Sequence, residues 1–527
     1  MLDLREQPKK SLGQLLEGLR VLQIEGDAAV PVSGLAYHSG RVQPGDIFVA
    51  LKGLQTDGHL FIPQAIARGA RVLVVEEEVP RQPGVIYVRT PDTRLALAHM
   101  AAALADHPSR ELTLIGLTGT NGKTTTTYLL ESIWQASGAA VGVIGTVNCR
   151  FGDSIVPSPV TTPESLDLQT LLRQMRTARV SCAIMEVSSH ALDLKRVHAS
   201  NFAAAVFTNL SQDHLDYHQS MAAYFAAKSR LFTELLGANG ARGLAVVNLD
   251  DPWGQRLRQQ LSPPVLTYGF AAGVDVRPRH YTLALDGSHA LVDTPSGPLE
   301  ITSPLLGHYN LSNILAAAAT AVGMGLAPEH IVTGLANING VDGRLEPVSL
   351  PGQPLVLVDY AHTPDALQQV LKAVRALPFR RVITVFGCGG DRDKTKRPRM
   401  GQAAAQGSDL VIVTSDNPRT EDPLAIIRHI VAGLQELRWP RLERADLERE
   451  ERGYLVEPDR RQAIRLAIEA STPADVVLVA GKGHETYQIV GTKRHHFDDR
   501  EEARQALAKR ASQRQQNHHS REHQGEA

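Results

Sequence analysis

Short runs of β-branched and aliphatic residues alternate with longer amphipathic stretches along most of the chain. In the middle third these runs are "LTLIGLTG", "AVGVIGT", "CAIMEVSS", "AAAVFTNLS" and "GLAVVNLDD". Apolar runs separated by helical patterns are typical of strand–helix–strand units, so residues 108–344 predict a largely parallel sheet covered by helices. The stretch "GHYNLSNILAAAATAVGMG" predicts a helix that closes this region.

The flanking regions show related patterns. The first 107 residues contain the strand-like runs "GDIFVALKG", "ARVLVVEEE" and "GVIYVRT" around the helical "IPQAIARGA". Residues 345–509 contain "PLVLVDY", "RVITVFG", "DLVIVTS" and "DVVLVAG", each followed by a loop and a helical pattern. We therefore predict an α/β protein with three domains, 1–107, 108–344 and 345–509. The polar, His-rich residues 510–527 predict a disordered tail rather than a metal-binding one.

Composition narrows the class of protein. The 527 residues are 43% hydrophobic and 21% charged with a net charge of −1, which fits a globular protein and gives no reason to expect nucleic acid or an anionic membrane as partner. No run approaches the roughly 20 apolar residues of a membrane span, and the N-terminus lacks a signal-peptide core. Three widely spaced cysteines, Cys149, Cys182 and Cys388, indicate a reducing compartment. We expect a cytoplasmic protein.

A glycine-rich segment, "IGLTGTNGKTTTTYLL", joins one predicted strand to a helix. Backbone N–H groups in such a loop can bind phosphates, Lys123 can reach the β- and γ-phosphate oxygens, and Thr124 can hold Mg²⁺. The glycines do not match the GxxxxGK[ST] spacing, and the loop reads GTNGKTT. A simple strand–helix turn is the alternative, but Gly-Lys-Thr-Thr at this position favours a nucleotide site.

Two more residues could complete a metal site. Glu186 in "IMEVSSHAL" and His214 in "TNLSQDHLDYH" follow strands of the same predicted sheet, and strand ends share the edge where ligands bind. A lone histidine is more often a turn or core residue, but the shared edge favours a metal ligand. Lys228 in "AYFAAKSRLF", taken alone, is a lysine whose stem is buried and whose amine reaches solvent.

Four loops in the last region each begin as a strand ends: "VDYAHTPDAL", "FGCGGDRDKTKRPRMG", "TSDNPRTEDP" and "AGKGHETYQ". In a doubly wound sheet all four would meet at the carboxyl edge. Their arginines and acids could bind the carboxylates and ammonium groups of a small zwitterion, although a run such as "RDKTKRPR" is often only a solvated face. The residues in question are His362, Arg392, Asp416, Asn417, Arg419 and Glu485.

Taken together, these motifs resemble those of the Mur ligases, over nearly the whole chain apart from the tail. The motifs are "GTNGKTT", "EVSSHAL", "DHLDYH", "AAKSRLF", "DGRLE", "DYAHTPDAL", "GCGGDRDKTKRP", "DNPR" and "GKGHE". The resemblance implies an N-terminal UDP-substrate domain, a central P-loop ATPase and a C-terminal Rossmann-like domain. It also implies an ATP- and Mg²⁺-dependent ligase that adds meso-diaminopimelate to UDP-N-acetylmuramoyl-L-Ala-D-Glu through an acyl phosphate, with small molecules as its partners. The sequence does not indicate the oligomeric state, and a monomer is the expectation.

The resemblance also implies roles for individual residues. Catalysis would fall to Lys123, Lys228, Glu186 and His214, with Thr124, Glu186, His214 and a carbamylated Lys228 around Mg²⁺. ATP would bind Gly119, Thr120, Asn121, Gly122, Lys123, Thr124, Thr125, Arg344, Asp359 and His362. The UDP substrate would bind Ser39, Thr161, Thr162, Ser188 and Arg196. Diaminopimelate would bind Arg392, Asp416, Asn417, Pro418, Arg419, Gly481 and Glu485.

The chain departs from the usual family pattern on the UDP side, at His38, Gly40, Val160 and Leu194. Three other functions remain open at this stage. A lysine-adding ligase of the same family is disfavoured by "DNPR", since Arg419 suits a second carboxylate. Folylpolyglutamate synthase is disfavoured by the N-terminal domain. A nucleotide-gated switch would leave the four C-terminal loops without a role.

Overall fold

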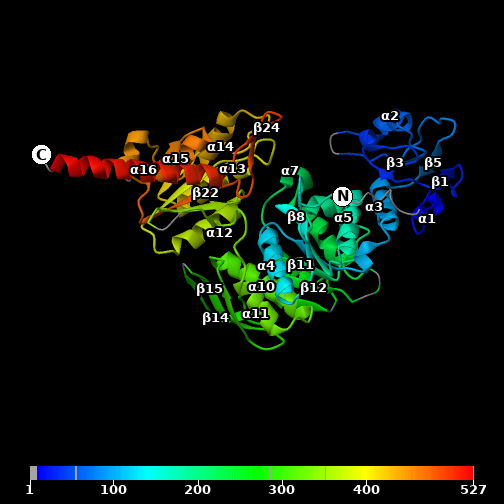
Figure 1. The fold of residues 1–527 in the computed structure, drawn as a ribbon, viewed down its shortest axis with the longest axis horizontal. Coiled ribbons are helices and arrows are strands. Elements are labelled where there is room, and N and C mark those ends of the chain that lie inside the picture. Colours follow the sequence, from blue (N-terminus) through cyan, green and yellow to red (C-terminus); the bar gives the residue numbers. More distant parts are fainter. Residues whose placement is uncertain are drawn as a thin grey trace.

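The computed structural model describes residues 9–53, 56–238, 240, 242–262, 264–284, 286–349, 352–449 and 451–525. These residues form three α/β bodies that follow one another along the chain (Figure 1). The N-terminal body, in blue, and the C-terminal body, in yellow to red, lie at opposite ends of the view, with the central body between and below them. Within these ranges, no helix combines the length and apolar character needed to cross a membrane.

The N-terminal body is a five-stranded sheet in the order β1-β5-β4-β3-β2, in which only the β1–β5 pair is antiparallel. The predicted strands of this region correspond to β3, β4 and β5, and the predicted helix to α2. The elements are α1 (Leu12–Leu16), β1 (Gln23–Glu25), β2 (Leu35–Ala36), β3 (Ile47–Val49), α2 (Ile62–Ala67), β4 (Val72–Val75), β5 (Ile86–Arg89) and α3 (Thr93–Leu104).

The central body is an eight-stranded sheet in the order β13-β12-β11-β6-β10-β7-β8-β9, parallel from β13 to β7. Strand β6 lies between β10 and β11, so the ends of these three strands are neighbours. The strands are β6 (Thr113–Thr118), β7 (Val141–Ile144), β8 (Asn148–Phe151), β9 (Ser154–Pro157), β10 (Cys182–Glu186), β11 (Ala204–Phe207), β12 (Leu244–Asn248) and β13 (Val265–Tyr268).

Helices cover this sheet, and a small antiparallel sheet is appended to it. The helices are α4 (Lys123–Ala136), α5 (Ser165–Thr177), α6 (Ser189–Asp193), α7 (Leu215–His218), α8 (Met221–Arg230), α9 (Pro252–Arg258), α10 (His308–Gly323) and α11 (Pro328–Ala336). The appended strands are β14 (Arg277–Ala284), β15 (Gly287–Asp293) and β16 (Leu299–Ser303). The predicted closing helix is α10.

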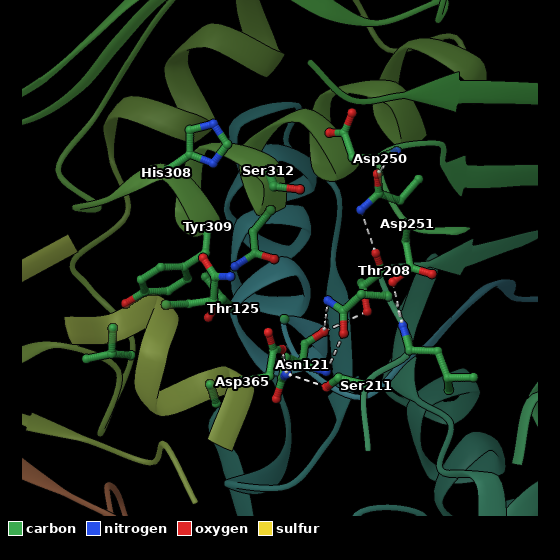
Figure 2. Close-up of a pocket in the computed structure, with 18 of the residues that line it drawn as sticks. Asn121, Thr125, Thr208, Ser211, Asp250, Asp251, His308, Tyr309, Ser312 and Asp365 are labelled. Atoms are coloured by element: carbon green, nitrogen blue, oxygen red, sulfur yellow. Dashed lines mark hydrogen bonds between the residues drawn. The ribbon is translucent and has the colours of Figure 1, made fainter. Parts of the chain in front are cut away.

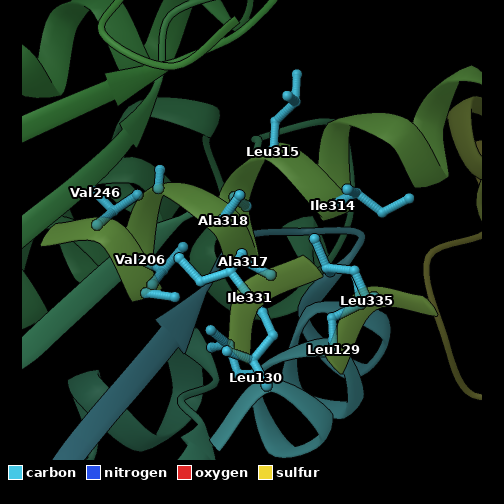
Figure 3. Close-up of a cluster of buried hydrophobic side chains, with 14 of the residues drawn as sticks. Leu129, Leu130, Val206, Val246, Ile314, Leu315, Ala317, Ala318, Ile331 and Leu335 are labelled. Carbon is cyan, nitrogen blue, oxygen red and sulfur yellow. The ribbon is translucent and has the colours of Figure 1, made fainter. Parts of the chain in front are cut away.

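Apolar side chains fix helix α4 against the sheet. Leu129 and Leu130 of α4 pack with Ala317 of α10, Ile331 of α11 and Val206 of β11 in one fully buried cluster (Figure 3). Each buried leucine or isoleucine contributes about 1.5–3 kcal/mol relative to exposure. Because this cluster fixes α4 in place, the N-terminus of the helix is held at the end of β6.

The C-terminal body is a six-stranded sheet in the order β17-β18-β22-β19-β20-β21, parallel except for the β17–β18 pair. Its strands are β17 (Glu346–Pro347), β18 (Leu355–Asp359), β19 (Arg381–Phe386), β20 (Leu410–Val413), β21 (Gly453–Val456) and β22 (Asp475–Ala480). Because β18, β22, β19 and β20 are successive neighbours, the four loops predicted to meet do follow adjacent strands.

The remaining elements of this body are α12 (Pro364–Arg375), α13 (Lys396–Gly407), α14 (Pro423–Glu436), α15 (Arg460–Ala470), the hairpin β23 (Tyr487–Val490) and β24 (Lys493–His496), and α16 (Asp499–Gly525). Helix α16 differs from the expectation of a disordered tail from residue 510. The segment has helix-favouring alanine, arginine and glutamine and no proline, so its first turns continue without a break.

Candidate active site

The predicted phosphate loop connects β6 to α4. Gly122, the N-cap of α4, has a φ of +86°, and a Cβ at this position would lie 2.4 Å from Asn313 Oδ1. The position therefore requires glycine for both its backbone conformation and its close contact with α10. The backbone N–H of Asn121 donates to Asn209 Oδ1 at 2.9 Å, which fastens the loop to the segment after β11. The loop thus presents the N-terminus of α4 to the cavity described below, as phosphate binding requires.

Two lysines share one carbonyl oxygen of this loop. Lys123 Nζ and Lys228 Nζ each donate to Gly119 O at 2.8 Å, and Lys228 is only 1% exposed. Burial lowers the pKa of Lys123, and burial together with the neighbouring Lys123 holds the pKa of Lys228 well below its usual value. Lys228 therefore does not reach solvent, and its surroundings favour the uncharged amine over the ammonium form.

Glu186, at the end of β10, is buried and fully partnered. Its carboxylate accepts from Thr124 Oγ1 at 3.0 and 3.1 Å, from the backbone N–H of Thr146 at 2.9 Å and from Thr146 Oγ1 at 2.9 Å. The structure therefore brings Thr124 and Glu186 together as predicted, and the threonines replace the water that a buried carboxylate loses.

His214 precedes helix α7 with a φ of +55°, and its ring contacts those of His190 at 5.0 Å and Tyr224 at 6.0 Å. Lys228 Nζ lies 4.7 Å from the same Tyr224 ring. Burial lowers the pKa of His214 to about 3, so the imidazole is neutral, the form that binds metals. Within the described ranges, no group of three or more His, Cys, Asp and Glu side chains is arranged to hold a metal ion.

A cavity of about 370 Å³ lies between the central and C-terminal bodies (Figure 2). Of the predicted ATP-binding residues, those that line it are Asn121, Gly122, Thr125, Arg344 and Asp359. The central body also contributes Thr208, Asp250, His308 and Tyr309, and the C-terminal body contributes Asp365. Asn121 Nδ2 donates to Asp365 Oδ2 at 3.0 Å, so the phosphate loop touches both bodies across this cavity.

One wall of the cavity is aromatic. The rings of Phe270 and His308 stack with centroids 3.9 Å apart, and Tyr281 meets both edge-on. Asp250 accepts from the backbone N–H of Phe270, which fixes this segment. A planar surface beside polar groups suits a nucleobase. These residues are separated by tens of positions in the sequence, and no motif in the sequence indicated them.

The three residues predicted to face ATP from the C-terminal side have different surroundings. Arg344 Nη2 donates to Thr124 Oγ1 at 3.3 Å, and its guanidinium lies 4.8 Å from the Tyr360 ring. The carboxylate of Asp359 accepts from two backbone N–H groups at 2.7 Å, and burial raises its pKa. His362 does not line the 370 Å³ cavity. Its Nδ1 lies 2.9 Å from Tyr360 O.

Asp213 connects the two bodies, and sequence reasoning missed it. It lies 3.7 Å from His362 Nε2 and 3.5 Å from Lys396 Nζ, both in the C-terminal body. Burial opposes its ionisation, but the hydrogen bond with His362 and the charge of Lys396 hold the pKa of Asp213 well below its usual range. Asp213 and Lys396 both lie in motifs noted in the sequence, yet 183 residues separate them and nothing in either motif indicates the pairing.

A second cleft, of about 860 Å³, lies between the central and C-terminal bodies. The central body lines it with Thr161, Thr162, Ser188, Arg196 and His214. The C-terminal body lines it with Arg392, Arg419, Glu485, Tyr360 and the hairpin residues Tyr487 and Arg494. We call it the acceptor cleft. It therefore unites residues predicted for two different substrates.

Behind the acceptor cleft, acids and amides form a network. Asn417 Nδ2 donates to Glu485 Oε2 at 2.9 Å, and Lys482 Nζ lies 3.0 Å from the same oxygen. Burial opposes ionisation of Asp416, but Lys482 and Arg460 hold its pKa below the usual value. The backbone N–H of Gly481 donates to Asp359 O at 3.0 Å. Asp416, Asn417, Pro418 and Gly481 thus shape the site from behind, while Glu485 reaches the cleft.

Arg419 projects into the acceptor cleft from a strained position, with a φ of +52°. Its backbone pairs with the hairpin, from Arg419 N–H to Ile489 O at 3.1 Å and from Gly491 N–H to Arg419 O at 2.8 Å. Its Nη1 donates to Gly390 O at 2.8 Å. Within the described residues, neither Arg419 nor Arg392 has a carboxylate partner, so both guanidinium groups can bind an anion in the cleft.

The UDP-side predictions fall near the junction with the N-terminal body. Cavities of about 160 and 540 Å³ there share Tyr37, Arg41 and Asp167, and the larger also reaches Val160 and Arg196. Tyr37 Oη donates to Asp167 Oδ2 at 2.5 Å. Ser39 Oγ instead donates to Gln64 Oε1 at 2.7 Å. Its predicted contact with the uridine side stays a prediction.

The other UDP-side residues lie closer to the acceptor cleft. Thr162 Oγ1 donates to Glu186 O at 2.9 Å and accepts from the backbone N–H of Ser188 at 3.0 Å. Of the departures from the family pattern, Val160 and Leu194 line the acceptor cleft, and His38 lines the small cavity while its Nδ1 accepts from Gly40 N–H at 3.0 Å. The departures therefore border the predicted substrate path.

Three family profiles match the chain in succession. They are "Mur ligase family, catalytic domain" over residues 31–108, "Mur ligase middle domain" over residues 117–321 and "Mur ligase, glutamate ligase domain" over residues 343–483.

Similar proteins cover nearly the whole chain. A UDP-N-acetylmuramoyl-L-alanyl-D-glutamate–2,6-diaminopimelate ligase of Geobacter metallireducens is 47% identical over 494 residues, covering 93% of this chain and 97% of that protein. One of Gloeobacter violaceus is 47% identical over 485 residues, covering 92% and 95%. A solved structure of a ligase with the same name is 33% identical with a TM-score of 0.66, covering 96% of this chain and 100% of the other. The chain therefore belongs to the Mur ligase family.

Proposed function

We propose that this protein is an ATP-dependent, ADP-forming ligase that joins meso-2,6-diaminopimelate to the D-Glu γ-carboxylate of UDP-N-acetylmuramoyl-L-Ala-D-Glu, a step of peptidoglycan precursor synthesis. The relatives at 47% identity carry the name of this ligase. The observation that carries the proposal is the acceptor cleft, which brings the predicted binding residues of two substrates together. The residues predicted for the UDP substrate are Thr161, Thr162, Ser188 and Arg196, and those predicted for the amino acid are Arg392, Arg419 and Glu485; His214 lines the same cleft. Such a cleft can hold a carboxylate and an amine together.

ATP would bind in the 370 Å³ cavity. Its phosphates would lie on the loop of residues 119–125 at the N-terminus of α4, and its base against the stacked Phe270 and His308. Lys123 lies in this loop, Arg344 reaches it from the end of the central body, and both can neutralise phosphate oxygens. The γ-phosphate would then point from the nucleotide cavity toward the acceptor cleft, where the carboxylate lies.

Magnesium is the metal expected with ATP, and the donor set fits it. Thr124 Oγ1 and the Glu186 carboxylate are already within 3.0 Å of each other, and His214 is neutral. Carbamylation of Lys228 would replace an amine by two anionic oxygens, the ligand type that Mg²⁺ prefers. When bound, Mg²⁺ reduces the repulsion between phosphate oxygens and an attacking anion.

The proposed reaction takes place between two anionic groups, a carboxylate and a phosphate. The γ-carboxylate attacks the γ-phosphorus, the bond to the ADP oxygen breaks, and an acyl phosphate forms. The amine of diaminopimelate then attacks the acyl carbon and phosphate leaves. Lys123 and Arg344 would stabilise the transferred phosphoryl group. The contact of Asp213 with Lys396 keeps the two bodies together, which limits water that would hydrolyse the acyl phosphate.

The domains divide these tasks. Residues 1–107 would bind the UDP part, with Ser39 on the uridine side, residues 108–344 the ATP, and residues 345–509 the amino acid. The proposed diaminopimelate contacts are Arg392, Arg419 and Glu485 in the cleft, supported by Asp416, Asn417, Pro418 and Gly481. We propose that the enzyme acts in the cytoplasm as a monomer on these three small molecules.

Phosphate release tests the proposal. The purified enzyme is given Mg²⁺, ATP and UDP-N-acetylmuramoyl-L-Ala-D-Glu with diaminopimelate, lysine, glutamate or no amino acid. We expect turnover only with diaminopimelate, a product with one added residue by mass spectrometry, and no turnover when the metal is chelated. Faster turnover with lysine would favour the lysine-adding alternative. Equal phosphate release without any acceptor would favour a nucleotide-gated switch.

A further inference from the structure

Direct hydrogen bonds connect the two loops that carry Arg392 and Arg419. Gly390 N–H donates to Asn417 O at 2.9 Å, and Arg419 Nη1 donates back to Gly390 O at 2.8 Å. Thr420 Oγ1 donates to Asp391 Oδ1 at 2.8 Å. The direction of the Arg419 side chain therefore depends on the position of residues 389–391.

An ion pair outside the cleft holds this same segment. Arg397 in α13 is 0% exposed and donates to both carboxylate oxygens of Glu421, at 2.8 and 3.1 Å. Arg397 Nη2 also donates to Gly389 O at 3.2 Å, and Glu421 Oε1 accepts from the backbone N–H of Asp391 at 2.6 Å. The pair thus holds residues 389–391 through a hydrogen bond at each end of the segment, at Gly389 and at Asp391.

The two loops are packed against each other at Gly390. A Cβ on Gly390 would lie 1.9 Å from Pro418 O, so even alanine would push the loops apart. The planar guanidinium of Arg397 binds the carboxylate through two parallel hydrogen bonds, which fixes the direction as well as the distance of the pair. Neither Arg397 nor Glu421 lines the acceptor cleft, so neither touches substrate.

We propose that the Arg397–Glu421 pair is a positioning device that sets the specificity of the enzyme, by holding the Arg419 guanidinium where it meets the second carboxylate of the amino acid. This inference rests on the proposed function, in which Arg419 binds that carboxylate. The pair distinguishes an amino acid with two carboxylates from one with a single carboxylate, although it contacts neither.

The test measures the ratio of kcat/KM with diaminopimelate to kcat/KM with lysine. The variants are Glu421→Gln, which removes the carboxylate, Glu421→Asp, which shortens it, and Gly390→Ala, which separates the loops while leaving the pair intact. Arg428→Gln is the matched control, because Arg428 of α14 forms an exposed ion pair with Asp422, the residue that caps the N-terminus of this helix. Arg419→Ala serves as the comparator.

We expect the ratio to fall at least about tenfold in Glu421→Gln and Gly390→Ala, less in Glu421→Asp and not at all in Arg428→Gln, with the KM for ATP unchanged. Partial misfolding lowers both kcat/KM values equally and leaves their ratio unchanged. If Glu421→Gln does not fold, the other two variants carry the test.

An unchanged ratio in Glu421→Gln and Gly390→Ala, beside a collapsed ratio in Arg419→Ala, would overturn the positioning role and leave the proposed function intact. An unchanged ratio in Arg419→Ala would instead overturn the carboxylate assignment itself, and the positioning role with it.

Discussion

Truncation of Arg419 to alanine isolates the recognition of the second carboxylate. The backbone of this residue is held by two hydrogen bonds to the β23–β24 hairpin, at 3.1 and 2.8 Å, which do not involve the side chain. The substitution therefore removes the guanidinium and its contact with Gly390 O while the loop stays tied to the hairpin. The positive φ of +52° costs alanine no less than arginine, so no strain is relieved.

The magnitude follows from the contacts that are lost. A hydrogen bond to a charged group contributes about 1.5–3 kcal/mol, and the guanidinium nitrogens other than Nη1 can make up to two with a carboxylate. Arg392 and Arg494 remain in the acceptor cleft and partly compensate. A net loss of about 2–4 kcal/mol corresponds to a fall of about 30- to 1,000-fold in kcat/KM for diaminopimelate.

The assay is steady-state phosphate release with varied diaminopimelate, then varied lysine, then varied ATP. Arg419 does not line the nucleotide cavity, so the KM for ATP should change by less than about twofold. Lysine turnover should be unchanged or improved, because no arginine is left without a partner. Parallel losses for diaminopimelate and ATP, or the same loss for both amino acids, would refute the reasoning.

Three other substitutions have defined outcomes. Lys228→Ala should abolish activity and remove the carbamate ¹³C signal that wild type shows in ¹³C-bicarbonate. Burial and Lys123 lower the pKa of Lys228 and so favour the uncharged amine that forms a carbamate; because acid restores the ammonium form, the wild-type signal should fade as pH drops. A persistent signal in the variant would contradict the assignment. Arg460→Ala should lower the free energy of unfolding, measured in urea, by about 3–5 kcal/mol, because Asp499, 2.7 Å away and equally buried, is left as an uncompensated charge. A decrease below about 1 kcal/mol would argue against a stabilising role for this ion pair. Asp213→Asn should lower kcat/KM about tenfold by leaving Lys396 without its anion, with the KM for ATP raised; unaltered kinetics would remove the interdomain contact from the mechanism.

Of all parts of the fold, the ends of the strands were predicted best from the sequence. Apolar runs such as "DLVIVTS" became β20, and the turn residues after each run marked the sheet edge where the site lies. The appended sheet β14–β16 was not predicted, because β14 reads "RPRHYTLA" and shows no clean alternation of buried and exposed residues. A strand of this kind is defined by its partners, which a local pattern does not show.

Within the site, local motifs predicted residue types better than pairings. Thr124 and Glu186 were expected at one metal site and do touch, because neighbouring strands bring them together. The contact of Asp213 with Lys396 was not predicted, since it depends on how two domains pack. Sequence likewise could not show that Asp416 would lie behind the cleft rather than in it.

The last helix has two parts of different practical value. Asp499, in its first turn, partners Arg460, which donates to Ala480 O at 2.9 Å and so supports a strand that ends at the proposed amino-acid site. The far end of α16 instead extends away from the C-terminal body (Figure 1). A truncation that removed Asp499 would therefore damage the enzyme, whereas the distal turns offer an attachment point for a fluorophore or a surface tether that leaves both clefts open.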